Sequence, residues 1–275
     1  MGLHRQHAAW LLGLEGLALL RYGAGDDVGD GFLEARLDEV RRIVDAVDGE
    51  MPLVDIGDIS VRDGYAIWAT TYDGEDNPLF EPEVAAIRPL LDALPLGRIA
   101  DVASGTGRHA GYLAERGHEV IAFDLTAEML AHGSGARVQA DLRSLPLPDG
   151  SVDAAVCTLA LTHLPDLDAA FGELARVVRP GGTIVTSDIH VLSLYLGGVA
   201  HADGKRMPAS RWFASDYIRA AGAAGLQILT CLEPRWPVMA GGGGPLAQAW
   251  CPVATAAAYR EVPAAIVWAF RVRQT

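Results

Sequence analysis

The sequence predicts an α/β fold: a doubly wound, mostly parallel sheet with helices on both faces, extended at the N-terminus by further helices. From residue 98 onward, short apolar runs alternate with amphipathic helical patterns. The first of these runs ends in a glycine-rich turn, and no repeat or linker divides residues 81–275. Because strands joined through helices run parallel, this alternation favours a parallel sheet between two helical layers.

The composition fits one large core, or one core with a small satellite domain. The chain has 275 residues, of which 50% are apolar. Its three cysteines, Cys157, Cys231 and Cys251, are widely spaced and form no C-x-x-C pair. This pattern argues against a disulfide framework and a structural zinc site, and it predicts a cytoplasmic location. No His/Asp/Glu cluster has the spacing of metal ligands, so we expect no metal.

The charge of the chain restricts its partners. The formal net charge is −13, and no basic run is longer than Arg41-Arg42. Nucleic acids and anionic membranes both require clustered Lys and Arg. We therefore expect a small-molecule acceptor and no binding of nucleic acid or membrane.

Two helices are predicted before the sheet, over residues 3–22 and 31–48. The first contains the apolar stretch 8–20, which resembles the core of a signal peptide, but Glu15 interrupts it and no cleavage site follows. The stretch is also too short to span a bilayer, so a buried amphipathic helix is the better interpretation.

The second of these helices has a continuous apolar seam. Its members recur at alternating spacings of four and three: Leu33, Leu37, Val40, Val44 and Val47. The seam would either cap the main domain or form a homodimer contact. We assign residues 1–60 to a helical cap and connector, and 61–275 to the main domain with a lid insertion near 190–213.

The remaining elements follow in order. Residues 51–80 mix Gly, Asp and Pro with aromatics and predict an irregular connector or lid. Strands are predicted near 98–102, 119–123, 137–140, 152–157, 183–188, 226–232 and 264–272. Helices are predicted near 81–94, 107–117, 126–133, 166–178 and 214–224. The 166–178 helix has the clearest period, and Pro180-Gly181-Gly182 should stop it.

The glycine-rich turn after the first strand predicts a nucleotide-like ligand. Glycine lets a ligand approach the backbone, and the following helix N-terminus offers free amides. Gly105-x-Gly107-x-x-Ala110 also satisfies a loose dinucleotide fingerprint, so an NAD-dependent oxidoreductase remains an alternative. Asp101 stands just before the turn, where a carboxylate opposes a pyrophosphate and suits a cationic amino-acid group.

Two further carboxylates close strands. Asp124 ends the second strand, where it could accept hydrogen bonds from ribose hydroxyls in either cofactor class. Asp141 ends the third strand, where it could accept from an adenine amino group.

Ordered motifs over about residues 80–190 narrow the choice. They are D-V-A-S-G-T-G at 101–107, Asp124, A-D-L at 140–142, L-P-L-P-D-G-S-V-D at 145–153 and R-V-V-R-P-G-G at 176–182. The set resembles class I S-adenosylmethionine-dependent methyltransferases of the ubiquinone/menaquinone-biosynthesis type. The resemblance implies a Rossmann-like, seven-stranded sheet with an antiparallel last strand, and S-adenosylmethionine as cofactor. One departure is Ala103, which stands where the family usually has its first glycine.

The resemblance also assigns roles to residues. Gly105 and Gly107 would line the methionine portion, and Thr158 would lie near its amino group. Asp124 would hold the ribose, while Asp141 and Leu142 would frame the adenine. The complete set predicted to contact the cofactor is Tyr72, Asp101, Ala103, Gly105, Gly107, Asp124, Leu125, Met129, Asp141, Leu142 and Thr158.

Two histidines are candidates for a general base, which is needed only when the acceptor must lose a proton early. His190 directly follows the fifth strand, whose C-terminal end should point into the crevice, and it is the better candidate. The alternative for His190 is a surface residue at a loop start. His163, in the loop after the fourth strand, could instead serve in packing or capping.

Aromatic residues predict two lids. Tyr65, Trp68 and Tyr72 would share one helical face, closing over the cofactor or packing in the core. In the first case Tyr72 contacts the cofactor and Tyr65 or Trp68 the acceptor. The insertion 201–213 carries Arg, Lys, Met and aromatics, and it would shape an acceptor pocket or form a surface loop.

The sequence thus predicts transfer of a methyl group from S-adenosylmethionine to an O, N or C nucleophile. The acceptor would be a small aromatic-containing metabolite, such as an indole or phenol, of secondary metabolism. The candidate catalytic residues are His190, His163 and Tyr65. An NAD-dependent oxidoreductase and a non-catalytic cofactor-binding protein are the alternatives.

Overall fold

The computed structural model describes residues 5–47, 57–74, 77–197, 200–237 and 244–274. Their contacts divide them into two compact units. The helical unit falls within Met1–Asp55, Leu192–Gly198 and Arg235–Ala264. The sheet unit falls within Ile56–Val191, Val199–Pro234 and Ala265–Thr275. The helical unit therefore includes two segments that the sequence analysis assigned to the main domain.

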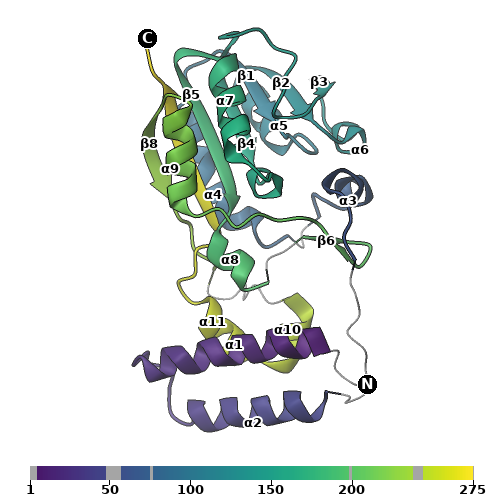
Figure 1. Cartoon of the computed structure of the whole chain (residues 1–275), viewed down its shortest axis with the longest axis vertical. Helices are drawn as coiled ribbons and strands as arrows, with labels where there is room; N and C mark the ends of the chain where they lie inside the picture. Colours follow the sequence, from purple (N-terminus) through teal and green to yellow (C-terminus); the bar gives the residue numbers. More distant parts are fainter. Residues whose placement is uncertain (1–4, 48–56, 75–76, 198–199, 238–243, 275) are drawn as a thin grey trace. The chain divides into compact units, whose positions relative to one another are not determined.

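The sheet unit is built on seven strands in the order β3-β2-β1-β4-β5-β9-β8 (Figure 1). Their bounds are β1 Arg98–Val102, β2 Glu119–Asp124, β3 Ala136–Gln139, β4 Val152–Thr158, β5 Val178–Ile189, β8 Leu226–Leu232 and β9 Ala265–Val272. The first five strands pair in parallel, and β9 lies antiparallel between β5 and β8. This topology confirms the predicted Rossmann-like fold and its antiparallel last strand.

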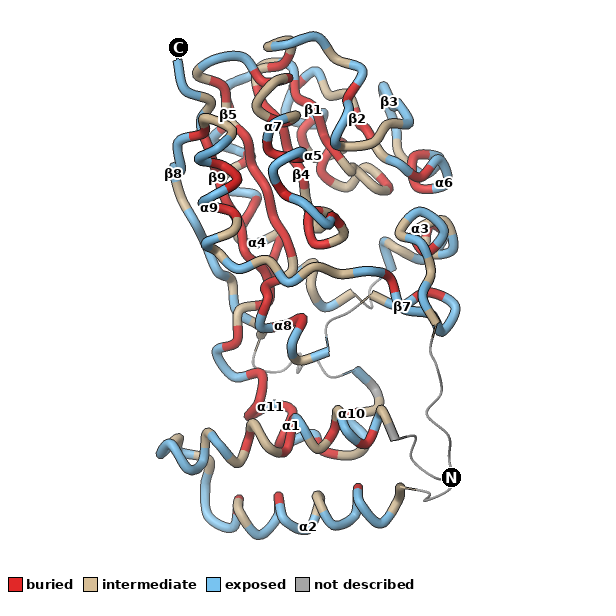
Figure 2. Tube along the Cα trace, viewed as in Figure 1, coloured by how far each residue is buried: buried red, intermediate tan, exposed pale blue. Residues whose placement is uncertain are grey.

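Helices cover both faces of this sheet. They are α4 (Phe80–Asp92), α5 (Arg108–Ala114), α6 (Ala127–Leu130), α7 (Leu167–Val177) and α9 (Ala214–Ala223). Successive side chains of β4 alternate between two apolar clusters, with Ala155 and Cys157 under α7 and α9, and Ala154 and Val156 under α4 and α5. Burial on both faces explains why the central strands read as continuous apolar runs (Figure 2).

Strand β5 differs from the prediction. The sequence analysis expected Pro180 and its glycines to separate a helix from a strand at 183–188, yet the strand begins at Val178. The pairing with β4 shifts register between Val152 and Ala154, so the Pro-Gly-Gly segment is an irregularity within the strand. Gly181, at φ +79°, supplies the left-handed turn that this irregularity needs.

The predicted connector and insertion lie side by side. The connector contains α3 (Val61–Trp68), and the insertion forms a hairpin of β6 (His201–Ala202) and β7 (Lys205–Arg206). The Ile59 amide donates to the Arg206 carbonyl (3.0 Å), and the Arg206 amide donates to Gly57 (3.1 Å). Met207 packs so closely on Gly64 that a Cβ there would lie 2.4 Å from its sulfur.

The helical unit buries a face of α2 other than the expected one. It comprises α1 (Arg5–Gly23), α2 (Phe32–Asp45), most of α8 (Val191–Tyr195), α10 (Gly244–Trp250) and α11 (Pro252–Tyr259). Leu37 and Val44 of the predicted seam are 39% and 52% exposed, whereas Phe32, Arg36 and Ile43 are buried. The seam does not lie on the buried face of α2, because Arg36 is paired there: its guanidinium contacts Glu15 at 3.1 Å and Glu39 at 2.7 Å.

No helix within the described ranges is both long and apolar enough to cross a membrane.

Candidate functional site

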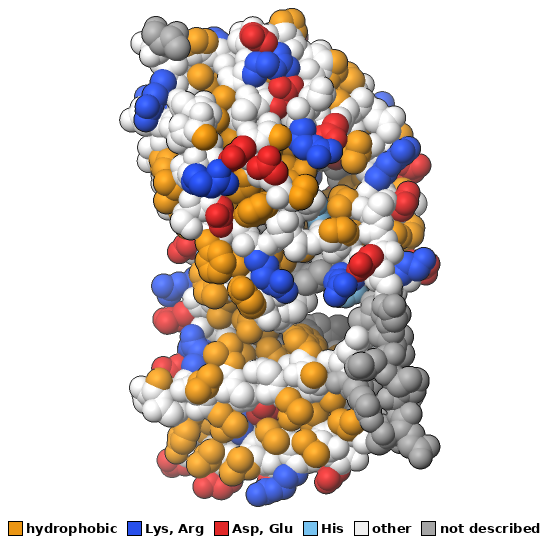
Figure 3. Space-filling model, viewed as in Figure 1, with side chains coloured by type: hydrophobic (Ala, Val, Ile, Leu, Met, Phe, Trp, Pro, Cys, Tyr) orange, Lys and Arg blue, Asp and Glu red, His pale blue; other side chains and the backbone are white. Residues whose placement is uncertain are grey.

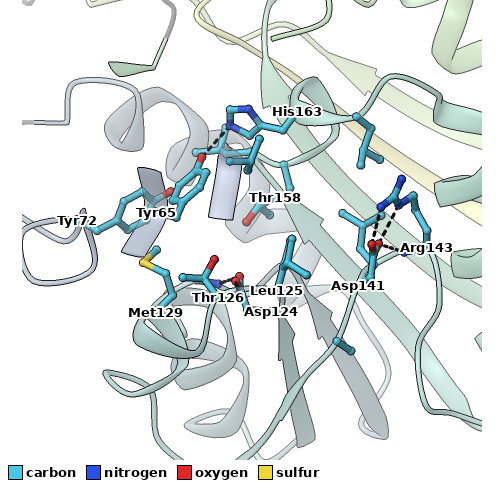
Figure 4. Close-up of a pocket in the computed structure, with 18 of the residues that line it drawn as sticks. Tyr65, Tyr72, Asp124, Leu125, Thr126, Met129, Asp141, Arg143, Thr158 and His163 are labelled. Carbon is cyan, nitrogen blue, oxygen red and sulfur yellow. Dashed lines mark hydrogen bonds and ion pairs between the residues drawn. The ribbon is translucent and has the colours of Figure 1, made fainter. Parts of the chain in front are cut away.

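A cavity of about 240 Å³ opens at the C-terminal ends of β1, β2 and β4 (Figure 4). Open α/β sheets bind their ligands at this end of the strands. The lining residues are Val61, Tyr65, Tyr72, Ala103, Gly105, Asp124, Leu125, Thr126, Met129, Ala140, Asp141, Leu142, Arg143, Thr158, Leu159, Ala160, His163, Leu164 and Pro165.

The glycine-rich turn forms one wall of the cavity. Gly105 (φ +57°) and Gly107 (φ +87°) both adopt left-handed conformations, and Gly107 precedes the first residue of α5. A Cβ on Gly105 would lie 3.2 Å from the Met129 methyl carbon, so the wall there is bare backbone. Ala103 is also left-handed, at φ +54°, and tolerates a conformation for which glycine is the usual residue.

Asp124 connects this turn to the end of β2. Its carboxylate accepts from the Gly105 amide and from the Thr126 amide, each over 2.8 Å. Burial raises the pKa of Asp124, while the backbone hydrogen bonds act in the opposite direction. The Asp124 carboxylate also lies on the cavity wall, where a ligand hydroxyl could reach it.

Asp101 lies behind the turn rather than on the cavity wall. It is 1% exposed, and within the described part of the chain neither carboxylate oxygen has a hydrogen-bond partner. Burial raises the pKa of Asp101 to about 6, although the nearby His109 favours the charged form. An anion so placed suits a cationic ligand and opposes a pyrophosphate.

The opposite side of the cavity carries an ion pair. Arg143 donates to Asp141 through Nε (2.9 Å) and Nη2 (2.6 Å), and this guanidinium lowers the pKa of the Asp141 carboxyl. In Figure 4 the pair lies across the cavity from Tyr65, Tyr72 and Met129, with Thr158 between the two sides.

Tyr65 and His163 meet at the upper end of the cavity. The Tyr65 hydroxyl lies 2.9 Å from His163 Nε2, and His163 Nδ1 lies 2.8 Å from the Pro208 carbonyl (Figure 4). A carbonyl can only accept, so Nδ1 carries the proton and Nε2 accepts from Tyr65. Burial lowers the pKa of His163 and raises the pKa of Tyr65, which keeps both groups neutral.

The aromatic segment 65–72 packs together as predicted. The ring centroids of Tyr65 lie 5.6 Å from Trp68 and 5.8 Å from Tyr72. One residue further, Asp73 accepts from the Thr106 hydroxyl over 2.8 Å. The segment is therefore attached at one end to His163 and at the other to the glycine-rich turn.

Comparison with known protein families identifies which enzymes have a similar domain. Residues 100–186, which run from β1 through most of β5, match the family described as "Methyltransferase domain". This stretch of the chain is similar to a methyltransferase domain. The match agrees with the sequence analysis, which expected a methyltransferase that uses S-adenosylmethionine.

Individual relatives of this chain are also named as methyltransferases. The demethylmenaquinone methyltransferase of Beutenbergia cavernae is 37% identical over 109 residues, which cover 37% of this chain and 45% of the relative. The chain spans less than half the length of the curated relatives that it matches.

Solved structures share the fold of the domain. A methyltransferase in complex with the Haloferax volcanii Trm112 activator superimposes with a TM-score of 0.64 at 19% identity, covering 78% of this chain and 98% of that chain. Geranyl diphosphate C-methyltransferase from Streptomyces coelicolor, solved with Mg²⁺, geranyl diphosphate and S-adenosyl-L-homocysteine, gives 0.53 at 18% identity, covering 69% and 79%.

Most predicted site residues of the methyltransferase domain come together. Of those predicted, Asp101, Gly107 and His190 do not line the cavity, and neither does Trp68, the alternative to Tyr65. His190 was the preferred base, but its Nε2 lies 3.3 Å from the Glu233 carboxylate, on the loop after β8. The insertion 201–213 contributes no lining residue either, because its Pro208–Trp212 part is hydrogen-bonded to the loop that carries His163.

The sequence analysis missed several lining residues. Thr126 and Arg143 each follow a predicted carboxylate by two positions, which was an available signal. Leu159 follows β4 at φ +53°. A leucine side chain does not predict this left-handed backbone conformation. The complete set of missed residues is Val61, Thr126, Ala140, Arg143, Leu159, Ala160, Leu164 and Pro165.

Proposed function

We propose that the chain transfers a methyl group from S-adenosylmethionine to an O, N or C nucleophile of a small, aromatic-containing metabolite. The observation that carries this proposal is the acidic surrounding of the glycine-rich turn. Asp124 lines the cavity beside Gly105, and Asp101 lies buried and unpartnered behind it among the described residues. A sulfonium with an α-ammonium group fits this environment, whereas a dinucleotide pyrophosphate does not.

The residues present fit this cofactor. Gly105 leaves the backbone open to a ligand, Asp124 can accept from ribose hydroxyls, and Asp141 stands at the end of β3 where an adenine amino group would lie. When bound, the cofactor supplies a methyl group on a sulfonium. The protein's part is to align the acceptor and exclude water.

His163 is the general base that the geometry supports. Its Nε2 carries a lone pair directed at the cavity end where Tyr65 lies, and the Pro208 carbonyl fixes the tautomer. With its pKa lowered by burial, the imidazole is neutral and ready to take a proton at pH 7. Tyr65, whose pKa is raised, is a poor base of its own.

The surface and the cysteines support the remaining inferences. Basic side chains of the sheet unit pair with acidic ones, as in Arg179–Asp153 (2.6 Å) and Arg219–Asp168 (2.7 Å). On the face drawn in Figure 3, basic and acidic side chains are interspersed and form no continuous basic stripe of the kind that nucleic acid requires. Cys157, Cys231 and Cys251 are free thiols, consistent with the cytoplasm. The exposed Leu37 and Val44 of α2 leave an apolar stripe for a homodimer.

Titration with S-adenosyl-L-homocysteine, and separately with NADH, tests this function. We expect micromolar affinity for the first and none for the second. Binding of NADH alone would instead support the oxidoreductase alternative. Binding of S-adenosyl-L-homocysteine without turnover of a broad panel of nucleophiles would support a non-catalytic cofactor-binding protein.

A further inference from the structure

The contact between Tyr65 and His163 indicates which chemical group of an acceptor could reach the base. The only position from which an acceptor can give a proton to His163 is Nε2, because Nδ1 is bonded to Pro208. That position is already taken by a phenol hydroxyl, at 2.9 Å. The chain's own tyrosine thus shows that a neutral phenol is accommodated at the base.

We propose that Tyr65 is a gate that occupies the acceptor's place, and that the acceptor is a compound with a neutral, ring-bound hydroxyl. The acceptor's O–H replaces that of Tyr65 on His163 Nε2. This inference rests on the proposed function and names the substrate class of the same site. It selects O-methylation among the O, N and C alternatives.

Size and burial support replacement over simultaneous binding. The cavity, at about 240 Å³, falls below the roughly 300–1,000 Å³ usual for small-molecule sites. Tyr65 and Tyr72 both line it, so withdrawal of the Tyr65 ring would enlarge it at the end where the base lies. The vacated position is bordered by the Tyr72 ring, whose centroid lies 5.8 Å from that of Tyr65, and this favours an aromatic replacement.

The burial and negative charge around Tyr65 favour an acceptor whose hydroxyl is neutral when it binds. The same burial that raises the pKa of Tyr65 would disfavour a phenolate entering from solvent, and Asp124 and Asp188 both add to this effect. The acceptor therefore enters as a phenol. Its proton moves to His163 Nε2, its oxygen lone pair forms the bond to the methyl carbon, and the C–S bond pair stays on sulfur. The proton then leaves from the imidazolium to solvent.

Phenol and anisole are the probes, because they differ in the hydroxyl that the gate model requires. Each is titrated into wild type, Tyr65→Phe and the matched control Tyr112→Phe, with S-adenosyl-L-homocysteine present. The Tyr112 hydroxyl donates to Asp92 on the surface, away from the cavity lining. We expect phenol to bind about two- to tenfold more tightly to Tyr65→Phe than to wild type, since the competing hydrogen bond is gone. Anisole binding and the Tyr112→Phe variant should show no such gain.

The ¹⁵N resonance of His163 Nε2 gives a second readout. In Tyr65→Phe it should shift toward that of an imidazole nitrogen without a donor, and phenol, but not anisole, should shift it back. Weaker or unchanged phenol binding in Tyr65→Phe would overturn the gate and make Tyr65 a partner of the acceptor. If S-adenosyl-L-homocysteine itself does not bind wild type, the proposed function fails, whatever phenol does.

Discussion

The carboxylate of Asp124 accepts hydrogen bonds from the amides of Gly105 and Thr126, each over 2.8 Å. One side chain thus fixes the glycine-rich turn and the start of α6 against the end of β2. Asp124→Ala should weaken S-adenosyl-L-homocysteine binding by about ten- to a hundredfold, because hydrogen bonds to a charged group contribute about 1.5–3 kcal/mol.

Calorimetric titration measures this loss. Asp168→Ala is the matched control: it removes one carboxylate from an exposed pair with Arg219 and should leave the affinity unchanged. Equal affinity in Asp124→Ala and wild type would show that the carboxylate does not contact the ligand.

Ala103 is held at φ +54°, where a Cβ costs roughly 1 kcal/mol. Ala103→Gly should therefore raise the free energy of unfolding by up to about 1 kcal/mol, or about 2–4 °C in Tm. Differential scanning calorimetry checks the shift. In Ala169→Gly, on the exposed side of α7, the same change should lower stability by about the same amount. A lower Tm in both variants contradicts the strain argument.

Asp188 is fully buried at the end of β5, and burial raises its pKa to about 7, although it accepts from Tyr217 over 3.0 Å. Between pH 4 and pH 7 the unfolded chain ionises this group while the folded chain does not, so stability falls as pH rises through that window. At pH 8 the charged Asp188 lowers the free energy of unfolding by on the order of a few kcal/mol.

Asp188→Asn removes this titration and should be more stable than wild type at pH 8 but not at pH 4. Urea unfolding at both pH values compares them. The control Asp166→Asn alters a carboxylate that caps α7 at the surface. A constant difference between wild type and Asp188→Asn across the range would exclude titration of Asp188 as the cause.

Arg36 is 2% exposed and lies between Glu15 and Glu39. Arg36→Met leaves the buried Glu15 and the partly exposed Glu39 without their cation and should destabilise the helical unit by about 3–5 kcal/mol. Arg41→Met removes the same charge from an exposed pair with Asp38 and should cost no more than about 0.5 kcal/mol. Hydrogen exchange of α1 and α2 amides distinguishes the two, and similar protection in both variants would refute the role of Arg36.

The sheet could be predicted from sequence because its determinants are local. Each central strand is a short apolar run bounded by turn residues, and the motifs that follow the strands carry the residues predicted to bind the cofactor. Asp124 and Asp141 were found because a strand end fixes where a side chain can go. The strands and the residues at their C-terminal ends were therefore predictable from local sequence.

The errors share a different cause, which is pairing between distant segments. Arg36 is buried between Glu39 of its own helix and Glu15 of α1, and the distant partner Glu15 is invisible to the periodicity of α2 that selected the wrong face. His190 turns to Glu233, and His163 is fixed by Pro208, both far away in the sequence. No spacing rule within one segment contains such information.

The position of β9 has a consequence for synthesis. This strand lies between β5 and β8, yet its residues 265–272 are made after every other strand of the sheet. Until they leave the ribosome, the inner edges of β5 and β8 have no partner, and the antiparallel part of the sheet cannot form. The nascent chain thus exposes two strand edges with unpaired backbone groups, and such edges can pair with other chains and aggregate. Chaperone dependence during translation should end only when this strand inserts.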